Sequence, residues 1–278
     1  INSIPIIEDW LSLDFINENR LLNWNDSINK LHISKEGSDN KSKSYRRLVF
    51  DELCANFIVL SKNRKRIKTE KILKNFKEKN SNLITKKLPF SLTESQKKVL
   101  KEINHDLKNK KRMFRIIQGD VGSGKTIVSL LAIANIIESG YQCALMGPTE
   151  ILAKQHYELT KKIFKYSKFK VNFLTGKTDK KEKKEILKNL ESGKIDLLIG
   201  THALFQKKII FKKLGLAVID EQHKFGVKQR LELAKKGGNN CDVLLMSATP
   251  IPRTMMMSLY GDMDISKITE KPSNRKKI

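Results

Sequence analysis

An eight-residue stretch, GDVGSGKT at 119–126, constrains the fold of this chain more than any other. It fits the pattern G-x-x-x-x-G-K-[ST], follows a short apolar run and precedes an apolar helical stretch. In that setting, successive backbone N–H groups converge on a phosphate at the positive end of a helix. A dinucleotide-binding loop does not fit, because its third glycine would fall where Ile127 stands. The sequence therefore predicts a loop that binds the phosphates of a nucleotide.

The residue types in this loop suit phosphate chemistry. Gly122 and Gly124 let the loop curl without clashes from Cβ atoms. Lys125 is predicted to reach the β and γ oxygens of ATP, and the hydroxyl of Thr126 to bind Mg²⁺. ATP and Mg²⁺ are thus the predicted cofactors. The residues expected to hold the nucleotide here are Gly119, Gly122, Ser123, Gly124, Lys125 and Thr126.

From about residue 86 onward, apolar runs that resemble strands alternate with helical stretches. These runs are 114–119, 142–147, 171–176, 196–201, 216–220 and 243–248. Their hydrophobicity is continuous rather than alternating, which is typical of strands covered on both faces. Residues 86–278 are therefore predicted to form an α/β domain, with a mostly parallel sheet flanked by helices. Ligands of such sheets bind at the carboxyl ends of the strands.

Residues 1–85 differ in composition and are predicted to form a smaller helical region. A polar linker at 34–44 precedes an amphipathic stretch at 45–60, where apolar residues recur at helical spacing. The lysine-rich run at 62–79 is predicted to continue this stretch as a solvated helix.

Two adjacent carboxylates, Asp220 and Glu221, end one of the apolar runs. Such neighbours repel each other and lose hydration, so a cation opposite them is expected. In this fold the run ends near the phosphate loop. Asp220 is therefore predicted to bind Mg²⁺ together with Thr126, and Glu221 to orient or polarise the attacking water. Lys125, Asp220 and Glu221 are the predicted catalytic residues, and a capping role for Asp220 is the weaker alternative.

Other polar residues are placed near the same strand ends. The hydroxyls of Ser247 and Thr249, in SAT, are positioned to bond the acidic strand end and to sense the state of the nucleotide. Gln96 precedes the phosphate loop, and a glutamine can bind adenine through N6 and N7. A position on a helix surface explains Gln96 equally well. His105 and His156 are interpreted as ordinary helix residues.

Composition sets weaker limits. The formal net charge of +25 permits a polyanionic partner, because cations gain affinity by releasing the counterions of nucleic acid. Lysine supplies most of this charge, so the charge alone does not identify a ligand. No apolar stretch is long enough to span a membrane, and membrane attachment is not expected. Cys54, Cys143 and Cys241 are odd in number and far apart, which favours a reducing, cytoplasmic setting.

Taken together, the motifs resemble those of superfamily 2 helicases. GDVGSGKT, DEQH and SAT look like motifs I, II and III of that superfamily. Further stretches narrow the similarity to the first motor domain of the RecG family, from about Leu88 to the end of the chain. These are GPTEILAKQHYE (147–158), FLTGK (173–177), GTHALFQ (200–206), DEQHKFGVKQR (220–230) and SATPIPRTM (247–255). YRRLVFDEL (45–53) resembles the helical segment that joins the wedge domain of RecG to its motor, and Lys224 departs from the arginine more usual there.

The resemblance implies a RecA-like ATP-binding domain in a helicase or translocase that remodels branched double-stranded DNA. Fork reversal and Holliday junction branch migration, in recombination and repair, are the implied activities. It also implies that His223, Ser247 and Thr249 couple nucleotide state to motion. A further set is implied to contact the phosphates of one DNA strand: Thr149, Thr175, Gly176, Thr201 and His202. For Thr149 and Thr201, a helix N-cap or turn role is compatible with the same contact.

The resemblance further implies partner domains in the same polypeptide, namely a second RecA-like domain and a wedge domain. Arg230, Arg253 and Arg275 follow the phosphate loop, but none lies in the Gln- and Gly-flanked cluster expected to reach the γ-phosphate. We therefore expect an internal piece of a longer enzyme, largely inactive alone, monomeric and associated with the bacterial nucleoid.

Three alternatives stay open. One is a translocase like the transcription–repair coupling factor Mfd, against which DEQH and the upstream helix weigh. Another is a nucleotide-gated DNA-binding module without motor activity. A small P-loop kinase fits less well, because it leaves the acid pair and the SAT strand unexplained.

Overall fold

The computed structural model describes residues 6–33, 42–67, 70–221, 236–249 and 263–270. The chain divides into two compact units, residues 1–63 and 64–278. This boundary lies earlier than the predicted one at residue 85. The reason is that residues 70–85 pack with the later unit: Ile84 is part of its core, and Lys71 and Lys74 bond to Asp242.

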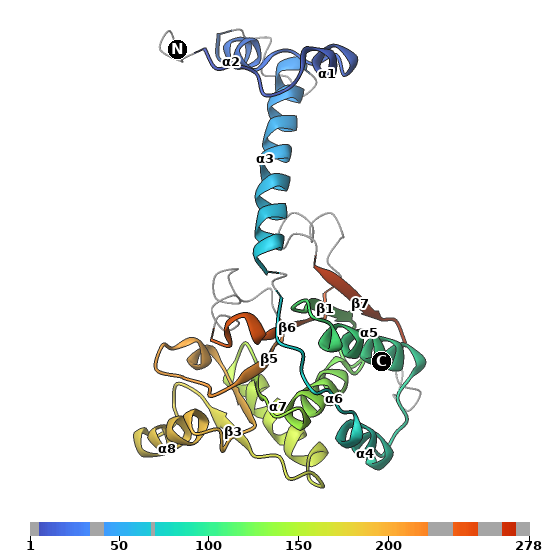
Figure 1. Ribbon diagram of the computed structural model, residues 1–278, viewed down its shortest axis with the longest axis vertical. Helices are drawn as coiled ribbons and strands as arrows, with labels where there is room; N and C mark the ends of the chain where they lie inside the picture. The colour runs from blue at the N-terminus through green and yellow to red at the C-terminus, as the bar shows by residue number, and fades with distance from the viewer. Residues whose placement is uncertain (1–5, 34–41, 68–69, 222–235, 250–262, 271–278) are drawn as a thin grey trace. The chain divides into compact units, whose positions relative to one another are not determined.

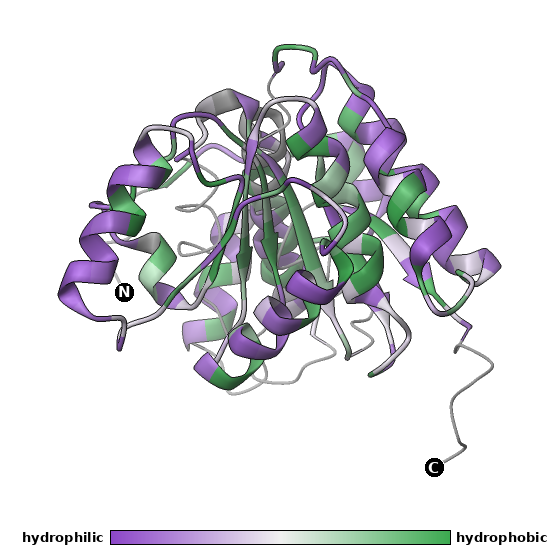
Figure 2. Ribbon diagram, turned by 90° about the horizontal axis from the view of Figure 1, so that it is seen from below, coloured by the Kyte–Doolittle hydropathy of each residue, from purple (hydrophilic) through white to green (hydrophobic). Residues whose placement is uncertain are grey.

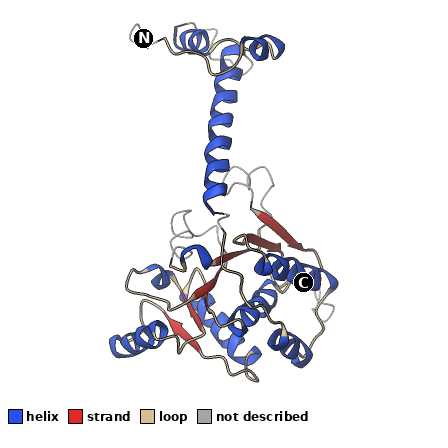
Figure 3. Cartoon of the chain, in the orientation of Figure 1, coloured by secondary structure: helices blue, strands red, loops and turns tan. Residues whose placement is uncertain are grey.

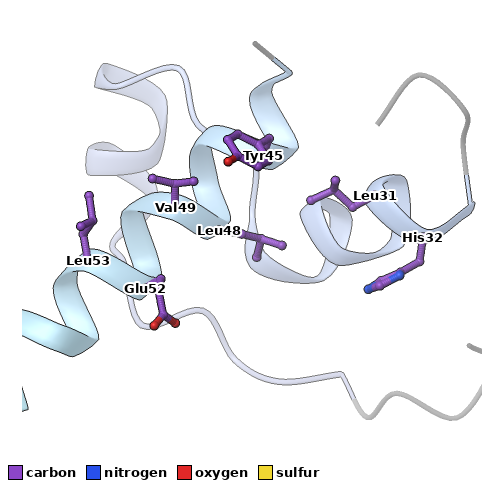
Figure 4. A pocket seen from close by; sticks show the side chains of 7 residues that line it. All are labelled: Leu31, His32, Tyr45, Leu48, Val49, Glu52 and Leu53. Carbon is purple, nitrogen blue, oxygen red and sulfur yellow. The ribbon is translucent and has the colours of Figure 1, made fainter. Parts of the chain in front are cut away.

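The first unit is helical, as predicted. Its helices are α1 (Leu13–Glu18), α2 (Trp24–Ile33) and α3 (Lys43–Ile67), the last of which continues past the boundary (Figure 1). An apolar groove of about 540 Å³ lies between α2 and α3, with Leu31, Leu48 and Val49 among its lining residues (Figure 4). Trp10 and Phe15 pack their rings against Phe50.

A buried arginine organises the first unit. Arg47, with no exposed side-chain surface, binds Asp9 through Nη2–Oδ1 at 2.6 Å and Asp51 through Nε–Oδ1 at 3.0 Å. It also donates to the carbonyl of Leu22 at 2.9 Å. The hydrogen bonds from Arg47 lower the pKa of Asp9 to about 2. Arg47 thus ties together the chain before α1, the chain before α2 and α3.

We expect Arg47→Met to destabilise this unit by about 3–5 kcal/mol, because two partly buried carboxylates would lose the buried cation that pairs with them. The chain holds two tryptophans, Trp10 and Trp24, and both lie in this unit, so tryptophan fluorescence during urea unfolding reports on it alone. Arg46→Met is the matched control, since Arg46 is exposed and the charge change is identical. Equal unfolding midpoints for the two variants would contradict the prediction.

The second unit is an α/β domain built on one seven-stranded sheet (Figure 3). The strand order is β3-β4-β2-β5-β6-β1-β7, and every pairing is parallel. The strands are β1 (Phe114–Gly119), β2 (Gln142–Met146), β3 (Val171–Leu174), β4 (Leu197–Gly200), β5 (Leu214–Ile219), β6 (Asp242–Ser247) and β7 (Asp264–Ile268). The helices are α4 (Lys79–Lys87), α5 (Glu94–Lys108), α6 (Lys125–Glu138), α7 (Glu150–Ile163) and α8 (Lys180–Glu191), with short 3₁₀ turns η2 (His202–Phe205) and η4 (Gly238–Asn240). The predicted RecA-like architecture, a parallel sheet flanked by helices, is confirmed.

Each face of the sheet carries its own core. Successive residues of a strand point to opposite faces, so Ile116 packs in one core and Ile117 in the other. One core includes residues of α4, α5 and α6, and the other includes residues of α8 and η2. Figure 2 shows the apolar strands enclosed by helices whose outward faces are hydrophilic. This double burial explains the continuous hydrophobicity of the strands. Among the described residues, no helix combines the length and the apolarity that a bilayer crossing requires.

The prediction of a solvated helix over 62–79 is wrong for residues 70–78. Residues 71–78 are not helical, and the side chains of Lys71 and Lys74 are fully buried. Lys71 Nζ lies 2.7 Å from Asp242 Oδ1, and Lys74 bonds the other oxygen of the same carboxylate. Burial lowers the pKa of Lys71, although the charge of Asp242 opposes this. Asp242 also accepts from the backbone N–H of Met113 at 2.7 Å.

Candidate functional site

The predicted site residues lie along one edge of the sheet, where the parallel strands end. The glycine loop follows β1, the acid pair follows β5, and SAT begins at the end of β6. These three strands are consecutive in the sheet. The segments predicted to contact DNA follow β2, β3 and β4, which are the three strands beyond β5. The fold thus places the two sets side by side on one edge.

The glycine loop has the backbone that the sequence predicts. Gly122 and Gly124 have φ angles of 78° and 88°, a left-handed region that disfavours side chains. A Cβ on Gly124 would lie 2.3 Å from Nε2 of Gln96. Gly124 is also the N-cap of α6, so the unbonded backbone N–H groups of the first turn point toward the loop.

Lys125 lies folded against this loop. Its Nζ donates to the carbonyl oxygens of Gly119 and, at 2.9 Å, Asp120. Burial lowers the pKa of Lys125, while the charges of Asp220, Glu221 and Asp120 oppose that shift. The cation therefore sits partly desolvated and close to both predicted catalytic carboxylates, where phosphate oxygens would replace the loop carbonyls as its partners.

Gln96 supports the loop from α5. Its Nε2 donates to the carbonyl of Ser123 at 2.8 Å, and its Oε1 accepts from the backbone N–H of Thr93 at 3.0 Å. The second bond completes a capping box at the start of α5. Gln96 is buried, so a position on the helix surface does not apply. One amide hydrogen and one lone pair are left over by these two bonds, and the adenine contact stays a prediction.

The loop and its surroundings fit Mg-ATP by three tests of donor chemistry. Ser123 Oγ is buried and, in the described part of the chain, has no hydrogen-bond partner. A phosphate at this loop would supply an acceptor. The N-terminus of α6 offers N–H groups to an anion. Thr126 and Asp220 offer oxygen ligands, which Mg²⁺ prefers.

Asp220 is held on three sides at the end of β5. Its backbone N–H donates to the carbonyl of Met146 at 2.9 Å, and its Oδ1 accepts from the N–H of Glu221 at 3.0 Å. Its Oδ2 lies 2.8 Å from Nε2 of His156, on α7. The prediction that His156 is an ordinary helix residue is wrong. Sequence spacing did not find this contact because the pair lies 64 residues apart.

Glu221 occupies an unusual backbone position. Its φ is 46°, a left-handed value that is uncommon for a residue with a side chain. Strain of this kind concentrates at functional sites. β5 ends at Ile219, so neither of the two adjacent carboxylates belongs to the strand.

The structure describes only some of the residues that are predicted to couple nucleotide state to motion. Ser247 is buried, and its Oγ donates to the carbonyl of Thr249 at 3.1 Å and lies 3.1 Å from Thr249 Oγ1. These bonds run within SAT, and the bond to the acidic strand end stays a prediction. His223 and Lys224 lie outside the described residues.

The segments predicted to contact DNA are joined to one another. The backbone N–H of Gly147 donates to Gly200 at 3.0 Å, which links the segment before Thr149 to the one before Thr201. Thr149 is the N-cap of α7, accepting from Leu152, so its alternative role is present. Thr149, Gly176 and His202 are exposed, whereas Thr175 and Thr201 are buried. A ligand in solution could therefore reach Thr149, Gly176 and His202 directly.

Comparison with known proteins agrees with this geometry. The family model of the DEAD/DEAH box helicases matches residues 93–258, more than half of the chain. The ATP-dependent DNA helicase RecG of Aquifex aeolicus is 46% identical over 258 residues, which are 90% of this chain and 33% of that protein. RecG of Streptococcus pneumoniae is 42% identical over 98% of this chain and 40% of its own length. The chain therefore spans between about a third and two-fifths of these relatives.

Solved structures show the same similarity. A structure of RecG bound to a three-way DNA junction superposes with a TM-score of 0.78 and 39% identity, over 98% of this chain and 37% of that one. A DEAD box protein from Methanococcus jannaschii shares only the fold, with a TM-score of 0.54 and 20% identity over 70% of this chain and 54% of that one. The chain belongs to the DEAD/DEAH box helicase family, and within that family it is similar to the RecG helicases.

Proposed function

We propose that this chain is the first RecA-like motor domain, with the preceding helical segment, of an ATP-dependent helicase that remodels branched double-stranded DNA. The observation that carries the proposal is the shared sheet edge, where the glycine loop and acid pair adjoin three DNA-candidate segments. The similarity to RecG over nearly the whole chain supports RecG-type activity over the Mfd-like alternative. The wedge domain and the second RecA-like domain are proposed to lie in the same polypeptide, which acts as a monomer in the bacterial cytoplasm.

The residues have the following proposed roles. Lys125 and the N–H groups of the glycine loop bind the β and γ phosphates of ATP. Thr126 and Asp220 hold Mg²⁺, which when bound neutralises charge on the phosphates. Glu221 orients the attacking water and accepts its proton. Thr149, Gly176 and His202 contact phosphates of one DNA strand, with Thr175 and Thr201 contributing through backbone groups. Such contacts position DNA without reading its sequence.

We expect Lys125→Ala in the full-length enzyme to remove ATP binding without unfolding the domain. The alanine leaves the two loop carbonyls without their donor, and it removes the cation that lies against the glycine loop. Calorimetric titration of ATP measures the loss, and a melting curve checks the fold. Lys97→Ala is the matched control, because Lys97 lies exposed on α5. ATP affinity equal to that of the wild type would contradict the assignment.

A further inference from the structure

We propose that His156 is a positioning residue for Asp220, holding one oxygen of the metal-binding carboxylate and tying it to α7. The proposal rests on the proposed function, since it assigns His156 a role in the same ATP site. His156 touches neither the glycine loop nor Glu221 in any contact described for it; it acts through Asp220. Its side chain comes from the middle of a helix that begins at the DNA-candidate residue Thr149.

The hydrogen bond between His156 and Asp220 is buried, and its donor and acceptor can be assigned. His156 and Asp220 are 7% and 9% exposed, and Nε2 and Oδ2 are 2.8 Å apart. An ionised carboxylate only accepts hydrogen bonds, so Nε2 must carry the proton in this contact. Sheltered from water, such a charge-assisted bond is stronger than a neutral one. Together with the N–H of Glu221 on Oδ1, it fixes the rotation of the carboxylate about the Cβ–Cγ bond.

The hydrogen bond from His156 leaves the carboxylate of Asp220 able to bind a metal ion. Each carboxylate oxygen has about two lone-pair sites. Oδ1 uses one for the N–H of Glu221, and Oδ2 uses one for His156. One site on each oxygen therefore stays available for a cation. Hydrogen-bonded partners of a ligating carboxylate commonly orient it in this way, and their loss typically costs about 10–100-fold in metal affinity or activity.

A second connection, through the main chain, also links Asp220 to α7. The N–H of Asp220 donates to Met146, the last residue of β2. From there the chain runs through Gly147 to Thr149 and into α7. The turn is tight, because a Cβ on Gly147 would lie 2.9 Å from the backbone nitrogen of Ala153. The side-chain bond of His156 closes this connection into a ring, so a movement of α7 at its DNA-facing end displaces the partner of Asp220.

The test uses the full-length enzyme and follows ATP hydrolysis as a function of Mg²⁺ concentration, with and without a forked DNA duplex. We expect His156→Leu to raise the half-saturating Mg²⁺ concentration about tenfold or more and to reduce the stimulation by DNA. His156→Gln should restore most of both values, because its Nε2 is a donor at similar reach. Thr160→Val is the matched control. Thr160 is buried on α7 and bonds the carbonyl of His156 at 2.6 Å, without touching Asp220.

The outcomes separate cleanly. A shift in His156→Leu that His156→Gln reverses and Thr160→Val lacks supports the proposal. An unchanged Mg²⁺ requirement in His156→Leu overturns it. Equal shifts in all three variants, with matching losses of melting temperature, overturn it too, because helix packing then explains them. A wild-type enzyme without ATPase activity would overturn the proposed function itself.

Discussion

Replacing Glu221 by Gln in the full-length enzyme should leave ATP and Mg²⁺ bound while hydrolysis falls by about 10²–10⁴-fold. That range is the usual contribution of a positioned general base. Asp220 keeps its bonds to Met146 and His156 in this variant, so its proposed role in binding Mg²⁺ should be preserved. The amide at position 221 cannot accept a proton from water, although it has nearly the same shape and suits the same left-handed backbone.

Two measurements check this result: calorimetry for Mg-ATP affinity, and phosphate release in single-turnover conditions. Glu185→Gln on α8 is the control, since it makes the same charge change at an exposed position. Hydrolysis near the wild-type rate in Glu221→Gln would return Glu221 to the role of a solvated charge at a strand end. Loss of ATP affinity would instead mean that Glu221 takes part in metal binding.

The second large effect concerns residues 1–278 alone. We expect this chain to bind Mg-ATP weakly and DNA in a salt-dependent, sequence-independent manner, with ATP hydrolysis about 10³–10⁵-fold below that of the full-length enzyme. An arginine supplied in trans to the γ-phosphate is typically worth that factor. In the proposed function, Lys125, Thr126, Asp220 and Glu221 supply one side of the nucleotide site and the second RecA-like domain supplies the other. A single RecA-like domain also has no second domain to move against, so no strand displacement is expected.

The comparison uses both proteins with the same forked duplex at low salt, measuring phosphate release and strand displacement. The Lys125→Ala variant of each protein, the full-length enzyme and residues 1–278, gives the background rate of ATP hydrolysis. DNA-stimulated turnover by monomeric residues 1–278, at a rate close to that of the full-length enzyme, would mean that a stabilising cation lies within this chain. Turnover that rises with the square of chain concentration would mean that two copies supply it to each other.

Local sequence motifs predicted the parts of the site that a short segment determines. The glycine loop is such a part, because its backbone and its lysine lie within eight residues. The six predicted strands were found for a similar reason, since burial on both faces leaves a continuous apolar run. β7 was missed: it lies at the edge of the sheet, and Asp264, Ser266 and Lys267 interrupt its apolar pattern.

Features that depend on distant partners were not predictable in this way. Lys71 and Lys74 lie in a lysine-rich run that resembles a solvated helix, and only Asp242, far along the chain, explains their burial. His156 is a similar case, since its partner Asp220 follows β5, 64 residues further along the chain. Gln96 was assigned to adenine or to a surface; its bond to the carbonyl of Ser123 requires α5 to be folded against the glycine loop. In each case a long-range contact decided the role of a polar residue.

The buried pairing of Lys71 and Lys74 with Asp242 has a mechanical consequence. Lys71 is four residues beyond the end of α3, and its buried contact anchors this stretch of the chain to β6. Asp242 is the first residue of β6, and Ser247 is its last. β6 therefore joins this buried anchor at one end to the SAT motif, which adjoins the predicted nucleotide site, at the other. Force and nucleotide state would act on the two ends of the same element.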